Sequence, residues 1–172
     1  MENQNRSYFK HVAAFLGLLI LIGGSYFVWD GYFSEGAKYR RQVEENMEKY
    51  NEWEKNYTKA MTEDTFGGKT PQETLDLFID ALKKEDVELA SKYFLLNEIG
   101  QVDQEWVDGL NQKKSEGKLQ EIALLLTKLQ KDQESSSFDT VWFSILNSDG
   151  IADYSAILKL NEFSKIWKIE SL

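Results

Sequence analysis

An uncharged run of 18 residues, Val12 to Trp29, is the feature that most limits how this chain can fold. A helix rises about 1.5 Å per residue, so the run and residues 9–11 together approach the roughly 30 Å hydrocarbon thickness of a bilayer. Aromatic side chains that favour the membrane interface lie near both ends of the run: Tyr8, Tyr26, Trp29 and Tyr32. We therefore expect a single transmembrane helix at residues 12–29 in contact with the lipid bilayer, preceded by a short tail at residues 1–11.

Two other structures could account for such a run. A buried core helix is seldom apolar on every face over this length. A cleaved signal peptide needs a site with small residues, and Gly23 and Ser25 match that pattern only weakly. Lysine and arginine are nearly balanced on the two sides, with Arg6 and Lys10 before the run and three such residues shortly after it. Because the segment before the run is short, we expect a signal anchor in the cell membrane that places the C-terminal domain outside the cytoplasm.

Residues 30–69 are predicted to form a helical stalk and a linker. Larger apolar side chains recur every three or four residues between Ala37 and Met61, on one face of a helix: Tyr39, Val43, Met47, Tyr50, Trp53, Tyr57 and Met61. This face could pack on the chain's own domain, contact a protein partner or a second copy, or lie loosely at the membrane. Tyrosine and tryptophan are poor coiled-coil residues, which favours packing on the domain. Gly67 and Gly68 mark the linker that follows.

The remaining residues, 70–172, are predicted to form one domain that begins with helices. Apolar spacing predicts four helices, at residues 70–82, 87–94, 103–114 and 119–133. The first has the clearest start, because Thr70 can cap it, Pro71 occupies the first helical position and Glu73 completes a T-x-x-E box. The fourth carries a leucine-rich stripe, which we expect in the core rather than on a docking face.

After Gln133 the apolar period changes to two residues, which is typical of strands. Three strands are predicted, at residues 138–146, 151–160 and 165–172, and Asn147 to Gly150 supply the hairpin turn between the first two. Helices followed by such a meander predict an α+β fold with helices on one face of an antiparallel sheet. Three strand residues are either core aromatics or the lining of a pocket, and core is the commoner role: Trp142, Tyr154 and Trp167.

The domain lacks the residue types on which most enzymes and metal sites rely. The chain has no cysteine, and its one histidine, His11, lies at the edge of the apolar run. Thiolate nucleophiles, zinc sites and a Ser-His-Asp triad are therefore excluded from the domain, and Asp139 and Asp153 are not expected to be catalytic. The formal net charge of −9 argues against a nucleic-acid partner, which usually requires a basic surface. No phosphate-binding or calcium-binding loop motif is present, so we expect no catalytic residue, no cofactor and no metal site.

Both ends of the domain resemble a known family. The segment TPQETLDLFIDALKKEDVELASKYF, Thr70 to Phe94, resembles the opening helix pair of small NTF2-like (cystatin-like) domains, and LKLNEFSKIWKIESL, Leu158 to Leu172, resembles their last two strands. Uncharacterised membrane-anchored bacterial proteins of the DUF4878 type share this opening and ending. The resemblance implies an NTF2-like fold, and it implies that an enzyme of this type would work through Asp, His or Tyr inside the cone of the sheet.

Different classes of function agree with these patterns. The favoured hypothesis is a membrane-tethered, non-enzymatic interaction or ligand-binding module. The alternatives are a tethered NTF2-like enzyme with a carboxylate-based site, and an assembly subunit of a cell-envelope complex that uses the stalk. A pocket with two convergent carboxylates would favour the enzyme.

Overall fold

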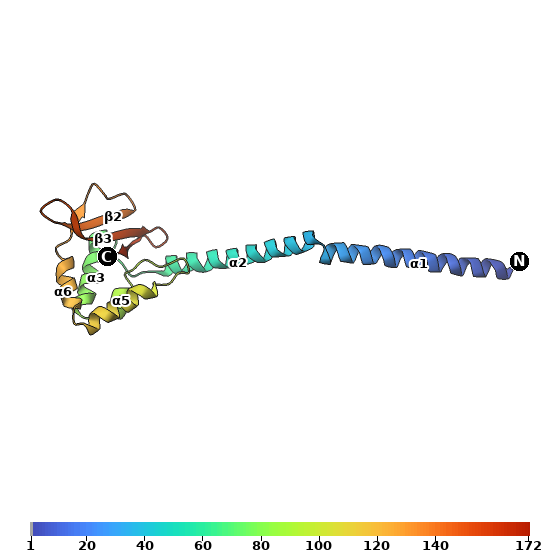
Figure 1. Cartoon of the computed structure of the whole chain (residues 1–172), viewed down its shortest axis with the longest axis horizontal. Helices are drawn as coiled ribbons and strands as arrows, with labels where there is room; N and C mark the ends of the chain where they lie inside the picture. Colours follow the sequence, from blue (N-terminus) through green and yellow to red (C-terminus); the bar gives the residue numbers. More distant parts are fainter. Residues whose placement is uncertain (1) are drawn as a thin grey trace. The chain divides into compact units, whose positions relative to one another are not determined.

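The computed structural model describes the backbone of residues 2–172 and the side chains of residues 9–172. The side chains of Arg6 and Tyr8, on which part of the membrane prediction rests, lie outside the described residues. The chain forms two compact units, one that extends to Glu52 and one from Trp53 to Leu172. Over the described residues, the first six elements of the chain are helices and the last four are strands (Figure 1).

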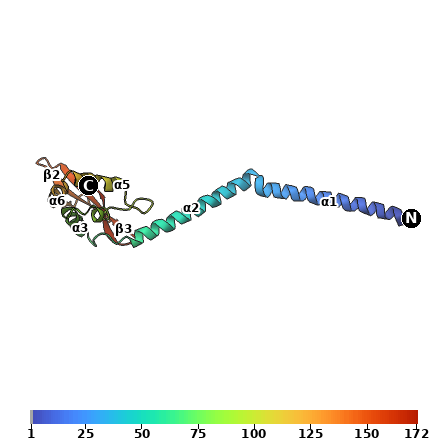
Figure 2. The ribbon, with the colours of Figure 1, turned by 90° about the horizontal axis from the view of Figure 1, so that it is seen from below.

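The first unit consists of helix α1, Glu2–Phe33, and most of helix α2, Glu35–Glu63. The segment Phe9–Phe33 has 25 residues, and its most apolar stretch of 18 residues has a mean hydropathy of 2.1 and is not buried, so α1 is long and apolar enough to span a membrane. This segment contains the predicted span, and α1 begins within the predicted tail. Figure 2 shows the break between α1 and α2, and Ser34 is the residue between the two helices. The Ser34 hydroxyl accepts a hydrogen bond from the Ala37 N–H at 3.2 Å and thereby caps the start of α2.

The helix predicted between Ala37 and Met61 is present as α2, which extends two residues further at each end. Its last turns belong to the second unit and pack there. Trp53 Nε1 donates to the Glu98 carbonyl at 2.7 Å, and the Tyr57 ring meets Phe163 edge-to-face with centroids 6.0 Å apart. Packing on the chain's own domain is thus confirmed for these turns. Earlier on the same face, Tyr39, Val43 and Met47 are exposed, and self-association through them remains a prediction.

The four domain helices begin where the sequence predicts them: α3 Pro71–Lys83, α4 Val87–Ser91, α5 Gln104–Ser115 and α6 Leu119–Leu126. The Thr70 hydroxyl accepts from the Glu73 N–H at 3.2 Å, as the capping box predicts. The Glu73 carboxylate accepts from the Lys69 N–H at 2.8 Å, so the return bond goes to the residue before the cap. Both bonds satisfy N–H groups that a helix start leaves unpaired.

The helix predicted at residues 119–133 is wrong in its second half, and the sheet has four strands instead of three. Helix α6 ends at Leu126, and the Leu129 N–H bonds back only three residues, to the Leu126 carbonyl at 3.2 Å. Strand β1, Gln130–Asp132, follows. Leu129 continues the apolar spacing of the helix, whereas the three polar residues of β1 have no pattern of their own. They form a strand because they pair with the edge of strand β2, Thr140–Leu146.

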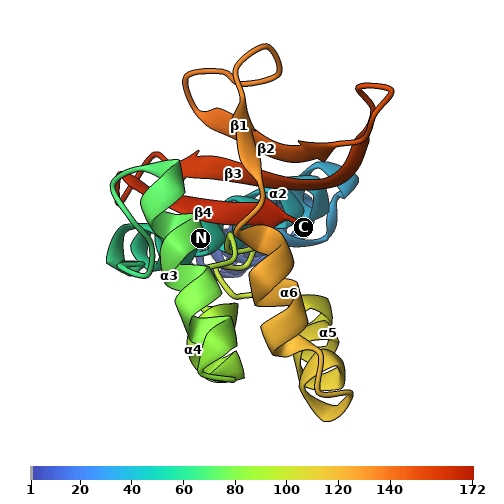
Figure 3. The same cartoon turned by 90° about the vertical axis from the view of Figure 1, so that its left-hand side faces the viewer.

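The sheet is antiparallel throughout, in the order β1-β2-β3-β4, where β3 is Ala152–Asn161 and β4 is Ile166–Ser171. Its buried face is apolar: Val141, Phe143, Ala156, Leu158, Trp167 and Ile169. Helices α3 and α6 lie side by side beneath this face, with α4 and α5 farther from the sheet (Figure 3). The α+β class with helices on one face of the sheet is confirmed.

The outer edge of β4 is covered by segments from the helical half. The Ile169 N–H donates to the Tyr93 carbonyl at 2.9 Å, and the Trp167 N–H donates to the Gly68 carbonyl at 2.9 Å. The linker must approach β4 closely to make the second bond. A Cβ atom at Gly67, where φ is +154°, would lie 2.3 Å from the Trp167 carbonyl oxygen, so the position requires glycine.

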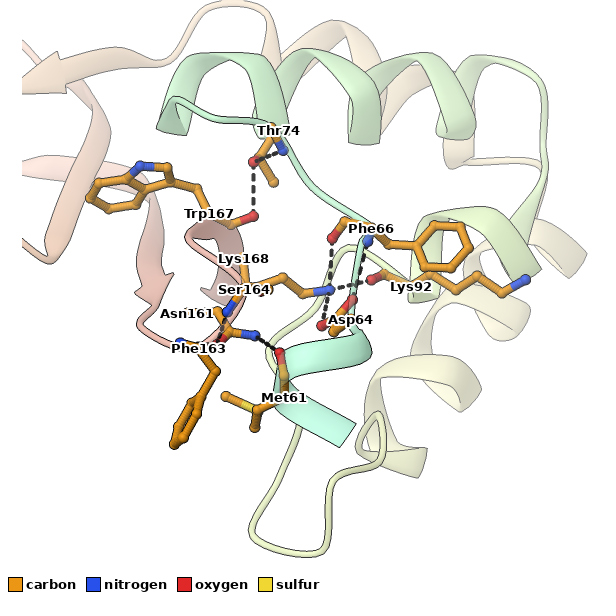
Figure 4. A network of polar contacts seen from close by, with 11 residues as sticks. Met61, Asp64, Phe66, Thr74, Lys92, Asn161, Phe163, Ser164, Trp167 and Lys168 are labelled. Carbon is orange, nitrogen blue, oxygen red and sulfur yellow. Dashed lines mark hydrogen bonds and ion pairs between the residues drawn. The ribbon is translucent and has the colours of Figure 1, made fainter. Parts of the chain in front are cut away.

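Lys168 extends from the other face of β4 toward the linker (Figure 4). Its side chain is fully buried, with Nζ 2.7 Å from the Asp64 carboxylate. The same ammonium donates to the Phe66 carbonyl at 2.8 Å and to the Lys92 carbonyl at 2.6 Å. Burial lowers the pKa of Lys168, and the contact with Asp64 acts against that shift. This ion pair therefore joins the linker after α2 to the last strand.

Candidate functional site

The three strand aromatics predicted as core or pocket residues occupy three different environments. Trp167 is 8% exposed and lies in the core beneath the sheet. Trp142 lies on the opposite face, because its neighbour Val141 pairs with Leu158 on the core face. Tyr154 is 55% exposed and lines a pocket between the helices and the sheet. Of the three, the structure brings only Tyr154 to this pocket.

The pocket is an apolar hollow of about 430 Å³ between α5, α6 and one end of the sheet. One wall comes from α6: Ile122, Leu125 and Leu126. The facing wall comes from α5: Trp106, Gly109 and Leu110. No aspartate or glutamate is among the described residues that line the hollow. The pocket therefore suits an apolar ligand.

Two buried rings, Phe78 and Phe94, form the floor of the pocket, next to Trp106 of the α5 wall. Phe94 stacks on Trp106 with ring centroids 4.5 Å apart and ring planes 10° apart. Phe94 also meets Phe78 edge-to-face, with centroids 5.5 Å apart and an angle of 78°. Such ring pairs contribute about 0.5–1.5 kcal/mol beyond the burial of their surface. Because Phe78 and Phe94 are completely buried, the floor is continuous with the core and should be rigid.

The pocket is open because α5 and α6 leave space between them. Helix α6 packs chiefly on α3, and α5 packs chiefly on α4. Gly109 faces the remaining space, and a Cβ atom added there would meet no described atom within 4 Å. A larger side chain at this position would extend into the hollow. The structure therefore has room for a larger side chain at this point of α5.

A second hollow of about 530 Å³ adjoins the first and shares four lining residues with it: Lys113, Ile122, Leu125 and Tyr154. Its other lining residues include two lysines and an acid: Lys118, Lys128 and Glu121. Lys113 Nζ lies 3.3 Å and Lys118 Nζ lies 3.0 Å from the same oxygen of Glu116. The Lys118 contact, with further hydrogen bonds from Gln112 and Lys113, lowers the pKa of Glu116 to about 2. The mouth of the apolar pocket is therefore charged.

The carboxylates considered as catalytic candidates lie away from the pocket. Asp153 is exposed and accepts from Asn147 Nδ2 at 3.2 Å. Asp139 accepts from the Ser137 hydroxyl at 2.8 Å, and this hydrogen bond lowers the pKa of Asp139. A carboxylate held ionised in this way does not act as a general acid near neutral pH. Within residues 9–172, no group of three or more histidine, aspartate or glutamate side chains is arranged to hold a metal ion.

Sequence reasoning identified part of the pocket wall without identifying the pocket. The leucine stripe of α6 and the apolar residues of α5 were assigned to helix faces, but their meeting depends on the tertiary structure. Lys113 and Lys128 belong to no motif, and the one local signal is Gly109 inside a predicted helix, where glycine is unfavourable. No protein-family model, curated protein or solved structure matches this chain, so the geometry of the pocket is the basis for a functional proposal.

Proposed function

We propose that this chain is a membrane-tethered, non-enzymatic ligand-binding module whose site is the apolar pocket between α5 and α6. The observation that carries the proposal is an open hollow of about 430 Å³ with an apolar lining. Protein interiors have few voids larger than a water molecule. Ligand sites, in contrast, are apolar clefts of about 300–1,000 Å³ with a few polar groups. Here the polar residues of the lining are Lys113, Tyr154 and Ser155.

The proposal assigns the tether to α1, which stays attached as a signal anchor and places the domain outside the cytoplasm. Its support is the length and hydropathy of the segment Phe9–Phe33, together with the weak match of Gly23 and Ser25 to a cleavage site. A fold of the NTF2-like, DUF4878 type is part of the same proposal. It is supported by the order of elements, with the helix pair α3–α4 first and the hairpin β3–β4 last.

A carboxylate-based enzyme has less support. The described lining of the apolar pocket contains no acidic residue, and the two candidate carboxylates on the strands lie elsewhere. Glu121 is the one acidic residue among the described residues that line the outer hollow, so no second carboxylate converges with it there. Binding an apolar ligand needs none of these groups to exchange a proton, so the pocket supports a binding role over catalysis.

The proposal is tested by blocking the pocket without unfolding the domain. Gly109→Leu adds a side chain where the structure has open space. It also removes a glycine from a helix interior, which by itself stabilises a helix by about 0.5–1 kcal/mol. Gly109→Ala makes the same change to the helix with much less bulk, and is therefore the matched control.

The measurement is photoaffinity labelling of the full-length protein in phosphatidylcholine nanodiscs with a diazirine-bearing decanol. Mass spectrometry should find label on peptides from both pocket walls in the wild type and in Gly109→Ala, and little there in Gly109→Leu. Labelling of α1, which is exposed to the same probe in all three proteins, is the internal standard. Label confined to α1, or pocket labelling that Gly109→Leu leaves unchanged, would refute the proposal.

A further inference from the structure

We infer that the pocket binds a single-chain amphiphile with an anionic head group. The alkyl chain lies in the apolar hollow, and the head group lies in the outer hollow near Lys113, Lys118 and Lys128. This inference rests on the proposed function and adds the chemical class of the ligand. It depends on three properties of the site: the adjacency of the two hollows, the charge of the outer one and the volume of the inner one.

The two hollows adjoin at the seam between α5, α6 and β3. Lys113 of α5, Ile122 and Leu125 of α6, and Tyr154 of β3 line both of them. The inner hollow ends on buried aromatic rings, and the outer hollow carries the charged side chains. A ligand whose chain fills the inner hollow therefore places its polar end among the lysines.

The outer hollow is basic, although the whole chain has a formal net charge of −9. Three lysines and one glutamate, Glu121, line it. Lys113 and Lys118 share the carboxylate of Glu116, and with Glu121 also counted against the three lysines the cluster has one positive charge in excess. Lys128 forms no ion pair with any side chain that the structure describes. An anionic head group would supply the missing negative charge through charge-assisted hydrogen bonds.

The volume of the inner hollow favours one alkyl chain over two. At about 430 Å³ it lies in the lower part of the range for small-molecule sites, which suits one alkyl chain better than the two of a diacyl lipid. Each methylene group that is buried contributes about fourfold in affinity. Affinity should therefore rise with chain length until the hollow is full, and then remain constant.

The experiment compares head groups at constant chain length, with the full-length protein in phosphatidylcholine nanodiscs. The probes are diazirine-bearing decanoate, the neutral decanol and decyltrimethylammonium. A fourth probe, a photoreactive monoacyl phosphatidylglycerol placed in the nanodisc, has the same anionic single-chain chemistry but a membrane source. At least one anionic probe should label the pocket about three- to fivefold more strongly than decanol. This ratio corresponds to the upper range of the free energy that an exposed charge pair contributes. Which anionic probe labels better distinguishes a soluble source from a membrane source, and either result supports the inference.

Lys128→Gln is the decisive variant because Lys128 lines the outer hollow. It should reduce labelling by the anionic probe toward the decanol level and leave decanol labelling unchanged. Lys131→Gln removes the same charge from an exposed residue of β1 outside both hollows, and should have no effect. Equal pocket labelling by the anionic probes and decanol overturns the inference and leaves the proposed function standing. Absence of pocket labelling by every probe overturns both.

Discussion

Lys168→Met tests whether the buried ion pair beside the linker stabilises the domain. The Lys168 ammonium lies 2.7 Å from the Asp64 carboxylate and donates to two backbone carbonyls, those of Phe66 and Lys92 (Figure 4). Methionine is similarly long and flexible, so it removes the charge and the donors while it disturbs packing little. Asp64 then remains buried without a counter-charge.

The expected loss in the free energy of unfolding follows from these contacts. Removing one partner of a buried ion pair destabilises a protein by about 3–5 kcal/mol. Two carbonyls also lose a donor, so the upper part of that range is expected for Lys168→Met. Asp64→Asn leaves Lys168 buried without its counter-charge, but Lys168 can then become neutral. From its ordinary pKa of 10.5, losing the proton at pH 7 costs about 5 kcal/mol, so Asp64→Asn should destabilise the protein by at most about that amount. The double variant should be more stable than the sum of the single effects by about 2–3 kcal/mol.

The assay is urea unfolding of the full-length protein in a mild detergent, followed by tryptophan fluorescence, with a check that the m value is unchanged. Lys159→Met is the matched control, because Lys159 is the cross-strand neighbour of Lys168 and pairs with Glu170 at 3.4 Å. Those two side chains are 44% and 38% exposed, so the control should cost less than about 1 kcal/mol. If Lys168→Met costs no more than the control, or if the single effects simply add, the reasoning is wrong.

The lowered pKa of Lys168 adds a pH dependence to the same comparison. Between that lowered pKa and the ordinary value of 10.5, the unfolded chain binds more protons at this group than the folded chain does. Stability contributed by this group therefore rises with pH across the interval. The difference in unfolding free energy between the wild type and Lys168→Met should grow as the pH approaches about 10 from below. A difference that shrinks over this range would contradict burial of the charged lysine.

Three further predictions concern the core, a helix cap and the membrane. Trp167→Ala should lower the free energy of unfolding by about 3–5 kcal/mol in urea, because the indole is buried; a loss below about 1 kcal/mol would place Trp167 on the surface. Thr70→Ala should cost about 1 kcal/mol in the same assay, since its hydroxyl caps α3, whereas Thr70→Ser should restore stability. The protein should be recovered with membranes, and protease added to intact cells stripped of their outer layers should digest the domain and spare an N-terminal tag. Protection of the domain would reverse the orientation.

The features that the sequence by itself determined are those controlled by nearby residues. The apolar run before Asp30 predicts a long helix because it carries no charge over 18 residues and is mostly apolar. Thr70 and Pro71 determine the start of α3, since a cap and a preset φ act within one turn. The turn at Asn147 to Gly150 is likewise local: the Asn147 side chain accepts from the Asp149 and Ile151 N–H groups at 3.0 Å each. Apolar periodicity placed most helices and strands for the same reason.

The tertiary structure decided the features that depend on residues far apart in the chain. Strand β1 forms because β2 provides an edge, and nothing within Gln130–Asp132 indicates a strand. Lys168 has the sequence position of a solvent-facing strand residue, and is buried because the linker brings Asp64 to it from 104 positions away. The pocket arises from a space between α5 and α6 at Gly109. An apolar pattern shows which face of a helix turns inward, but the packing of all the elements determines whether that face meets other side chains or an open hollow.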